Sequence, residues 1–165
     1  EFAANNFFHN QSGQSFIPSE AEFGLDDPDH SSSYTYIDLD RDGDLDIIAN
    51  TLYGPFKIYT NNNTQGNSVT FKLIDERGNR FCLGCTLVIR YGPDGKRHQM
   101  REIKTGGGFH SYDEPMAHFG LGEHKTIHQI EIIWSTGETS KLEHEFVANQ
   151  EYTLHRQSVS IGNEP

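Results

Sequence analysis

The feature that most constrains this chain is the segment Asp38–Asp46, which reads DLDRDGDLD and places a carboxylate at every second position. Two like charges 4 Å apart repel by about 4 kcal/mol at an effective dielectric constant near 20, and one arginine cannot neutralise five carboxylates. A divalent cation can. Calcium accepts about six to eight oxygen ligands in irregular geometry, whereas magnesium requires a near-octahedral shell and retains its waters. The segment therefore predicts a loop that binds Ca²⁺.

The spacing of the acids assigns a role to each of them. In a loop that wraps a cation, the side chains at positions 1, 3, 5 and 9 can converge, and position 7 contributes its backbone carbonyl. These positions are held by Asp38, Asp40, Asp42, Asp46 and, at position 7, Asp44. Gly43 at position 6 permits the sharp turn. Position 12 is Ala49 and not the bidentate glutamate that closes an EF-hand.

The residues on both sides of the loop favour strands. Segment 34–37 (YTYI) precedes it and Ile47 and Ile48 follow it, and such β-branched and aromatic residues are typical of strands. We therefore expect a strand–loop–strand site, with a solvated acidic turn as the alternative. The nearby acidic segment 26–29 (DDPD) is expected to be a solvated turn that could lend a carboxylate to the same ion.

The pattern of the whole chain predicts a mainly β fold. Short runs rich in Val, Ile, Thr, Tyr and Phe are separated by turns, many of them formed by the chain's 16 glycines. The polar segment 60–67 reads as a linker between an expected repeat at residues 1–63 and a second domain at residues 68–158. We expect one propeller-blade-like repeat in the first part, packed on an antiparallel β-sandwich or barrel-like domain in the second.

Charge and hydropathy limit the partners. The net charge of −11 argues against nucleic acid, because phosphate binding needs clustered Lys and Arg, and we expect no such cluster in this chain. No apolar run approaches the roughly 20 residues of a membrane-spanning helix, so we expect no membrane insertion. Cys82 and Cys85 leave a short disulfide and two buried thiols equally open, and metal or redox use is the weaker alternative.

Two parts of the chain resemble known families. Residues 8–10 (FHN), the acidic segment and residues 47–62 resemble an FG-GAP/VCBS repeat, the calcium-binding unit of integrin-like β-propellers. The second half resembles the ASPIC/UnbV domain of the cartilage acidic protein-like family. The matching segments are Asn79–Arg80 with Gly84, 101–103 (REI), 106–109 (GGGF), 118–122 (HFGLG), 130–137 (IEIIWSTG) and 148–149 (AN).

The resemblance implies a calcium-binding extracellular or secreted protein of adhesion or matrix type, without catalytic activity. It also implies further propeller repeats in a longer parent chain and a protein or glycan partner outside cells. An extracellular setting agrees with the loop itself, since modules of this kind bind calcium with dissociation constants of about 10⁻⁴ to 10⁻³ M and are saturated only where calcium is millimolar.

Two other functions remain as alternatives. The first is calcium-dependent carbohydrate binding, although most of the candidate aromatics are more simply core residues: Tyr53, Phe56, Phe109, Tyr112 and Trp134. The second is a hydrolase or metal enzyme built on polar residues around the triple glycine, namely His110, Tyr112, Asp113, Glu114 and His118. We prefer no enzyme, because no serine elbow, Walker loop or HExxH motif is present and His118 more simply satisfies backbone groups at a strand end.

Overall fold

The computed structural model describes residues 5–63 and 65–160. The first four residues of the expected repeat and Thr64 of the expected linker lie outside the described residues. Strands account for 44% of the described residues and helix for 3%, so the predicted mainly β class is confirmed. The chain divides into two compact units, the first with residues 1–39, 45–61 and 107–112, and the second with residues 40–44, 62–106 and 113–165.

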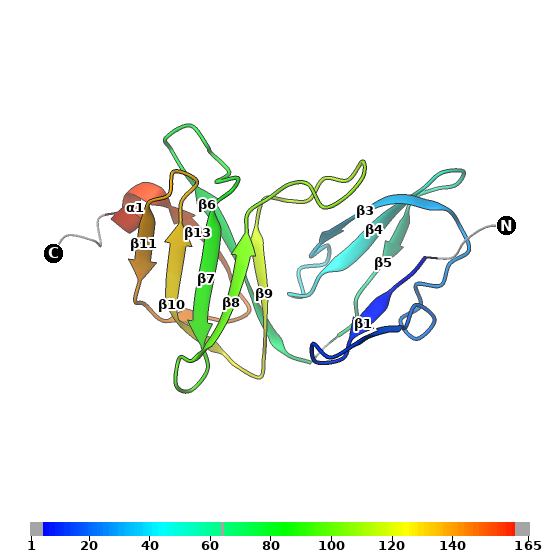
Figure 1. Cartoon of the computed structure of the whole chain (residues 1–165), viewed down its shortest axis with the longest axis horizontal. Helices are drawn as coiled ribbons and strands as arrows, with labels where there is room; N and C mark the ends of the chain where they lie inside the picture. The colour runs from blue at the N-terminus through cyan, green and yellow to red at the C-terminus, as the bar shows by residue number, and fades with distance from the viewer. Residues whose placement is uncertain (1–4, 64, 161–165) are drawn as a thin grey trace. The chain divides into compact units, whose positions relative to one another are not determined.

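The first unit consists of short antiparallel strands. Strand β1 (Phe8–Asn10) pairs with β2 (Phe16–Pro18). A separate three-stranded sheet has the order β3–β4–β5, formed by Ser31–Ile37, Asp46–Thr51 and Lys57–Tyr59 (Figure 1). In this sheet Ile37 lies opposite Asp46, so the acidic segment forms the loop of the β3–β4 hairpin.

The second unit is built from two sheets. One has the order β11–β10–β7–β8, with β12 also paired to β10, and the other has the order β13–β6–β9 (Figure 1). The strands of the first sheet are β7 (Thr86–Tyr91), β8 (Arg97–Glu102), β10 (Thr126–Ile133), β11 (Thr139–Leu142) and β12 (Phe146–Val147). The strands of the second are β6 (Asn67–Ile74), β9 (Ala117–Gly122) and β13 (Glu151–His155), which is followed by the short helix α1 (Arg156–Ser160). No helix in the described part is long and apolar enough to cross a membrane.

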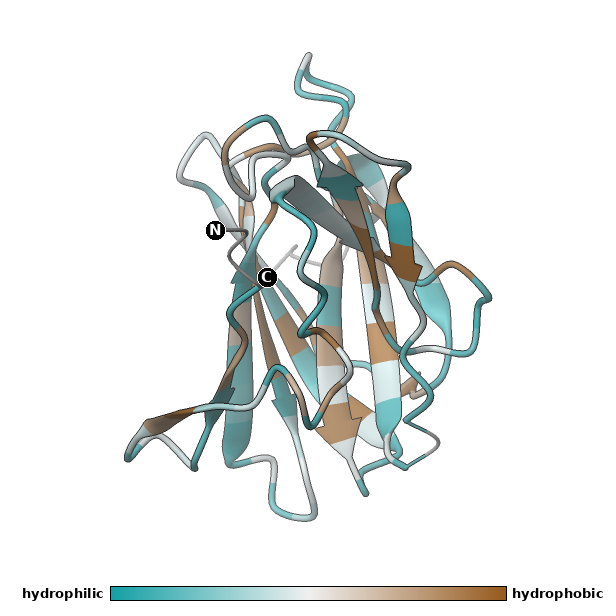
Figure 2. Ribbon diagram, turned by 90° about the vertical axis from the view of Figure 1, so that its right-hand side faces the viewer, coloured by the Kyte–Doolittle hydropathy of each residue, from teal (hydrophilic) through white to brown (hydrophobic). Residues whose placement is uncertain are grey.

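The hydrophobic core of the second unit follows the two-residue period of its strands. Along β6, Val69, Phe71 and Leu73 are buried while their neighbours are partly exposed, and β7 alternates in the same way (Figure 2). Successive side chains of a strand point to opposite faces, so each strand turns one apolar face to the core. The described strands form no closed barrel, and the arrangement agrees with a β-sandwich.

Two features of this unit were not evident from local sequence. Strand β9 contains Gly120 and Gly122, which have low strand propensity, yet it pairs with β6 from Asn67 to Phe71. Strand β13 joins the other edge of β6 in parallel, whereas antiparallel pairing was expected. A parallel partner returns from far along the chain, and no local turn signal announces it.

The first unit has little apolar core of its own. Among the described residues, Ala49 is its one buried hydrophobic residue, and the connected core cluster lies entirely in the second unit. Twelve of the 17 large hydrophobic residues that are exposed belong to the first unit. Its fold therefore needs support other than internal apolar burial. The expected packing of the repeat on the second domain and the expected domain boundaries stay predictions.

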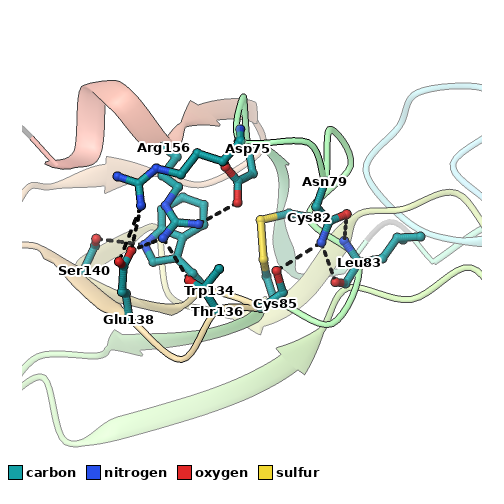
Figure 3. The surroundings of a disulfide bond; sticks show 12 residues. Asp75, Asn79, Cys82, Leu83, Cys85, Trp134, Thr136, Glu138, Ser140 and Arg156 are labelled. Atoms are coloured by element: carbon teal, nitrogen blue, oxygen red, sulfur yellow. Dashed lines mark hydrogen bonds and ion pairs between the residues drawn. A yellow bond between two sulfur atoms is a disulfide. The ribbon is translucent and has the colours of Figure 1, made fainter.

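A short disulfide closes the loop before β7. Cys82 and Cys85 are bonded and fully buried, which decides between the two alternatives left open by the sequence (Figure 3). The backbone N–H of Ile103 donates to the carbonyl of Cys85 at 2.8 Å, and the side-chain amide of Asn79 bonds both backbone groups of Leu83. The disulfide therefore lies in a loop that is already held by hydrogen bonds.

A buried ion pair connects the C-terminal helix to the rest of the second unit. The Nη1 of Arg156 lies 2.6 Å from the Oδ2 of Asp75, and both side chains are 2% exposed (Figure 3). The same guanidinium donates to Thr136 and Glu138 and stacks 4.8 Å above the ring of Trp134. Burial alone would raise the pKa of Asp75, but the backbone N–H of Arg77 and the guanidinium of Arg156 outweigh it, and the pKa is lowered.

We expect Arg156→Met to lower the free energy of unfolding by about 3 kcal/mol at pH 7, because it leaves the Asp75 carboxylate buried without its cation. Urea denaturation measures this change. Arg77→Met is the matched control, since Arg77 pairs with Glu138 at the surface and should contribute at most about 1 kcal/mol. Equal losses in the two variants would contradict the assigned role of the buried pair.

The Asp75 pair also predicts a pH dependence. The folded pKa of Asp75 lies below its unfolded value of about 3.9, so its contribution to stability is complete above that pH. The contribution is lost as the pH falls through the lowered folded pKa. The free energy of unfolding, taken from denaturation curves between pH 6 and about pH 2, should therefore fall less in Asp75→Asn than in the wild type.

Removal of the disulfide should have a moderate effect. Closing so short a loop restricts the unfolded chain by about 2 kcal/mol, so Cys82→Ala/Cys85→Ala should lower the free energy of unfolding by about that amount. Because both sulfurs are buried, the native protein should resist a mild reductant and yield two thiols only after denaturation. Thiol titration with and without urea tests this, and rapid reduction of the native protein would contradict it.

Candidate metal centre

The acidic loop lies between two paired strands, as the sequence predicted. Strand β3 ends at Ile37 and β4 begins at Asp46, so residues 38–45 connect them. The backbone is left-handed at two positions of the turn, Arg41 with φ of 64° and Gly43 with φ of 96°. Glycine adopts positive φ without steric cost, which explains its place at the sixth position of the loop.

Three of the five predicted ligands come together. One oxygen each of Asp38, Asp40 and Asp42 can be chosen so that all three lie within 4.8 Å of one another. Calcium binds oxygens at about 2.4 Å, so two ligands of one ion lie no more than about 4.8 Å apart. Asp40 and Asp42 are exposed and Asp38 is half-buried. The donor set and its spacing therefore fit a hard divalent cation.

Asp46 occupies a different position, at the base of the loop. Its side chain is 1% exposed, and its two oxygens accept backbone hydrogen bonds from Asn61 at 2.8 Å and Leu39 at 2.9 Å. The carboxylate thus ties the start of the loop to the chain that follows β5. Each oxygen has a second lone pair, so Asp46 can hold the loop and still face a cation.

Asp44 is outside the group of three carboxylates, and the expected role of its backbone carbonyl stays a prediction. Local bonds order the turn before it: the N–H of Asp42 donates to Asp40 at 3.3 Å, and the N–H of Asp44 donates to Asp42 at 3.1 Å. Asn and Asp side chains often bond the backbone two residues further on, which fixes a turn. The predicted ligand set of five stays a prediction, since the structure brings together three of its side chains.

The neighbouring acidic segment 26–29 has another partner. Asp27 and Asp29 both form ion pairs with Lys57 of β5, the second at 2.6 Å. The hydrogen bonds that Lys57 donates to the carboxylates of Asp27 and Asp29 raise its pKa to about 12. These carboxylates therefore hold β5 through a lysine, a role that the expected solvated turn did not include.

The polar residues around the triple glycine do not gather into a metal-binding group among the described residues. His110 and Tyr112 belong to the first unit, while Asp113, Glu114 and His118 belong to the second. His118 bonds the hydroxyl of Thr70 at 3.1 Å across the β6–β9 pair, and Glu114 pairs with Lys72 at 2.7 Å. Each of these two side chains thus has a structural partner in the β-sandwich.

The candidate aromatic residues separate into two groups. Trp134 is 2% exposed and donates from its ring nitrogen to Ser140, so its assignment to a glycan surface was wrong. Tyr53, Phe56, Phe109 and Tyr112 are between 64% and 88% exposed, which corrects the expectation that most belong to the core. Phe109 also lines a pocket of about 420 Å³ whose described lining residues all belong to the first unit.

Comparison with known proteins assigns the second half of the chain. The family model described as ASPIC and UnbV matches residues 75–161, which is more than half of the chain. The chain belongs to the ASPIC and UnbV family. Two relatives named cartilage acidic protein 1, from Mus musculus and Homo sapiens, are each 34% identical over 67 residues. That match covers 40% of this chain and 10% of each relative, so the aligned part is a small fraction of either whole protein.

The ASPIC and UnbV match covers most of the second unit, including the disulfide and β7 to β13. The acidic loop lies outside the matched residues. Its resemblance to an FG-GAP/VCBS repeat therefore stays a prediction, which depends on the loop geometry and not on the family match.

Two aspartates of the loop should behave differently when mutated. Without calcium, Asp46→Ala should lower the free energy of unfolding by about 1 to 3 kcal/mol, because the backbone N–H groups of Leu39 and Asn61 lose their buried acceptor. Asp40→Ala should change it little, since that side chain is exposed. Denaturation in chelator compares them, and equal losses would contradict the assignment of Asp46 to the base of the loop.

Proposed function

We propose that this chain is a non-catalytic extracellular module of matrix or adhesion type, in which Ca²⁺ bound by the Asp38–Asp46 loop stabilises the β3–β4 hairpin. The observation that carries the proposal is the convergence of Asp38, Asp40 and Asp42 within 4.8 Å on a turn of left-handed backbone. Oxygen ligands at this spacing suit calcium, and an ion would offset the repulsion among the carboxylates.

A structural role for the ion agrees with the poor core of the first unit. That unit buries little apolar surface, and small folds of this kind usually depend on metals, disulfides or neighbouring chain. An ion that binds only the folded hairpin adds its binding free energy to folding. The exposed hydrophobic residues further support our proposal that FG-GAP-like repeats in a longer parent chain cover the first unit.

Two observations support an extracellular location. The Cys82–Cys85 disulfide is buried, and disulfides persist in oxidising compartments and are rare in the cytosol. The relatives are named for cartilage, and we extend that setting to this chain by homology. A calcium site with a dissociation constant of about 10⁻⁴ to 10⁻³ M would also be filled outside cells.

Calcium should raise the thermal stability of the chain. A ligand present at ten to a hundred times its dissociation constant stabilises the folded state by about 1 to 3 kcal/mol, so the melting temperature should rise with calcium and fall in EDTA. Calorimetric titration gives the affinity and differential scanning calorimetry gives the shift. Asp42→Ala should abolish both signals because it removes one of the three clustered carboxylates.

Asp94→Ala is the matched control for this experiment. Asp94 lies in the β7–β8 turn and pairs with Lys96, and it is far from the acidic loop in the sequence. It should leave the calcium response unchanged. An identical melting curve in calcium and EDTA for the wild type, with no heat of calcium binding, would refute the proposed site.

Calcium-dependent glycan binding is the second candidate function. The observation in its favour is the exposure of Tyr53, Phe56, Phe109 and Tyr112, since aromatic faces stack on sugars and these rings are open to water. A glycan array probed in calcium and again in EDTA tests this candidate. Binding that requires calcium and is lost in Tyr53→Ala would favour it over a purely structural ion.

A further inference from the structure

The positive charge of this acidic protein is concentrated in one hairpin. Residues 90–104, here called the basic hairpin, carry five Lys and Arg against two acids and a net charge of +3. The remaining 150 residues carry eight Lys and Arg against 22 acids, a net charge of −14. The net charge of the whole chain concealed this contrast. The five cations are Arg90, Lys96, Arg97, Arg101 and Lys104.

The pairing of β7 and β8 arranges part of this charge on the outer face of the sheet. Arg90 lies directly opposite His98, and both are exposed. Side chains opposite one another on neighbouring strands stand about 5 Å apart, so the guanidinium and the imidazole form one pair of donors. The neighbours of Arg90, Ile89 and Tyr91, face the core, which fixes Arg90 on the solvent side.

Other cations lie on β8, the end strand of its sheet (Figure 1). The guanidinium of Arg101 lies 5.3 Å from the centre of the Phe119 ring and bonds the carbonyl of Met100 at 2.9 Å. The stem of Arg97 covers Gly92, where a Cβ atom would meet it at 3.4 Å. Packing thus restrains two arginines without neutralising them.

Most of the charge on the basic hairpin is available to a partner. Lys96 pairs with Asp94 at 3.0 Å. Within the described part of the chain, Arg90, Arg97 and Lys104 form no ion pair and are exposed. Cations at a sheet edge can also prevent another strand from pairing with that edge. This explanation does not account for Arg90, because Arg90 lies on the inner strand β7.

We propose that the basic hairpin binds a linear sulfated polysaccharide. Clusters of Lys and Arg form heparin-type patches, and the planar guanidinium matches the oxygens of a sulfate as it matches those of a phosphate. The choice of a polysaccharide rests on the extracellular location proposed above. The binding itself does not need the calcium loop, so the two proposals can fail separately.

The charge distribution favours a thin chain over a broad anionic surface. A strand such as β8 extends about 20 Å, and a single polysaccharide chain can follow it without approaching the acidic remainder of the protein. Duplex DNA or a lipid surface would face the remaining net charge of −14 as well. Among the described residues of the hairpin, Met100 is the one exposed large hydrophobic side chain, which gives little anchorage in a membrane.

The test is heparin binding by calorimetry and salt elution, carried out in EDTA on the full chain. We expect Arg90→Ala/Arg97→Ala/Lys104→Ala to weaken binding by at least about tenfold and to reduce the slope of log K against log salt by about 2. The matched control, Arg80→Ala/Lys125→Ala/Lys141→Ala, removes three exposed cations elsewhere and should change the affinity by less than about twofold.

Further probes separate the partners. Arg90→Lys/Arg97→Lys should retain most of the affinity, which distinguishes loss of charge from loss of folding. Desulfated heparin should bind far more weakly than heparin. No binding of heparin by the wild type, equal losses in the hairpin and control variants, or equal binding of desulfated heparin would overturn the proposal. Tighter binding of a DNA duplex or of vesicles with anionic lipid would overturn it in favour of those partners.

Discussion

The core contact made by Phe71 holds the second unit together. Its ring lies 6.2 Å from Phe119 of β9, 5.6 Å from Phe146 of β12 and 5.5 Å from Tyr152 of β13, measured between ring centres. One side chain of the central strand β6 therefore contacts both neighbouring strands and a strand of the opposite sheet. The rest of the core extends from this point because each strand turns alternate residues inward, and burial of such apolar area is the main favourable contribution to folding.

The first unit lacks an equivalent contact among its described residues and depends more on polar interactions. Asp46 bonds the backbone N–H groups of Leu39 and Asn61, and Lys57 joins Asp27 to Asp29. Such partly exposed ion pairs contribute little stability in water, whereas an ion held by several oxygens contributes its whole binding free energy to folding. The proposed calcium ion would therefore add support that the small apolar core of the first unit does not provide.

Charge serves three separate purposes in one acidic chain. The buried pair of Asp75 and Arg156 fixes the C-terminal helix, and both partners are enclosed so that removal of either one is strongly destabilising. The clustered carboxylates of the acidic loop repel one another, and the proposed cation would offset that repulsion. The basic hairpin concentrates cations at a sheet edge, where most of them remain available to an anionic partner.

Much of the fold and part of the candidate site could be predicted from sequence. The alternation of apolar and polar residues indicated most strands of the second unit. The spacing of the acids, together with Gly43, placed the loop between two strands. Both signals lie within a few residues and can therefore be read from local sequence. The pairing of β9 with β6 could not be predicted from local sequence, because Gly120 and Gly122 weaken the strand pattern. The engagement of Asp27 and Asp29 by Lys57 was missed because the partners are about 30 residues apart.

The sequence by itself determined the mainly β class, the position of the acidic loop and the family of the second half, since composition, short-range period and motifs carry that information. Tertiary structure alone decided that Trp134 is buried, that Cys82 and Cys85 are bonded and that β13 runs parallel to β6. It also decided that Arg90 and His98 stand side by side on one face. The parallel pairing and the burial of Trp134 depend on which distant segments meet in the folded chain. The disulfide and the Arg90–His98 pair depend on how one loop and one hairpin are shaped in the folded protein.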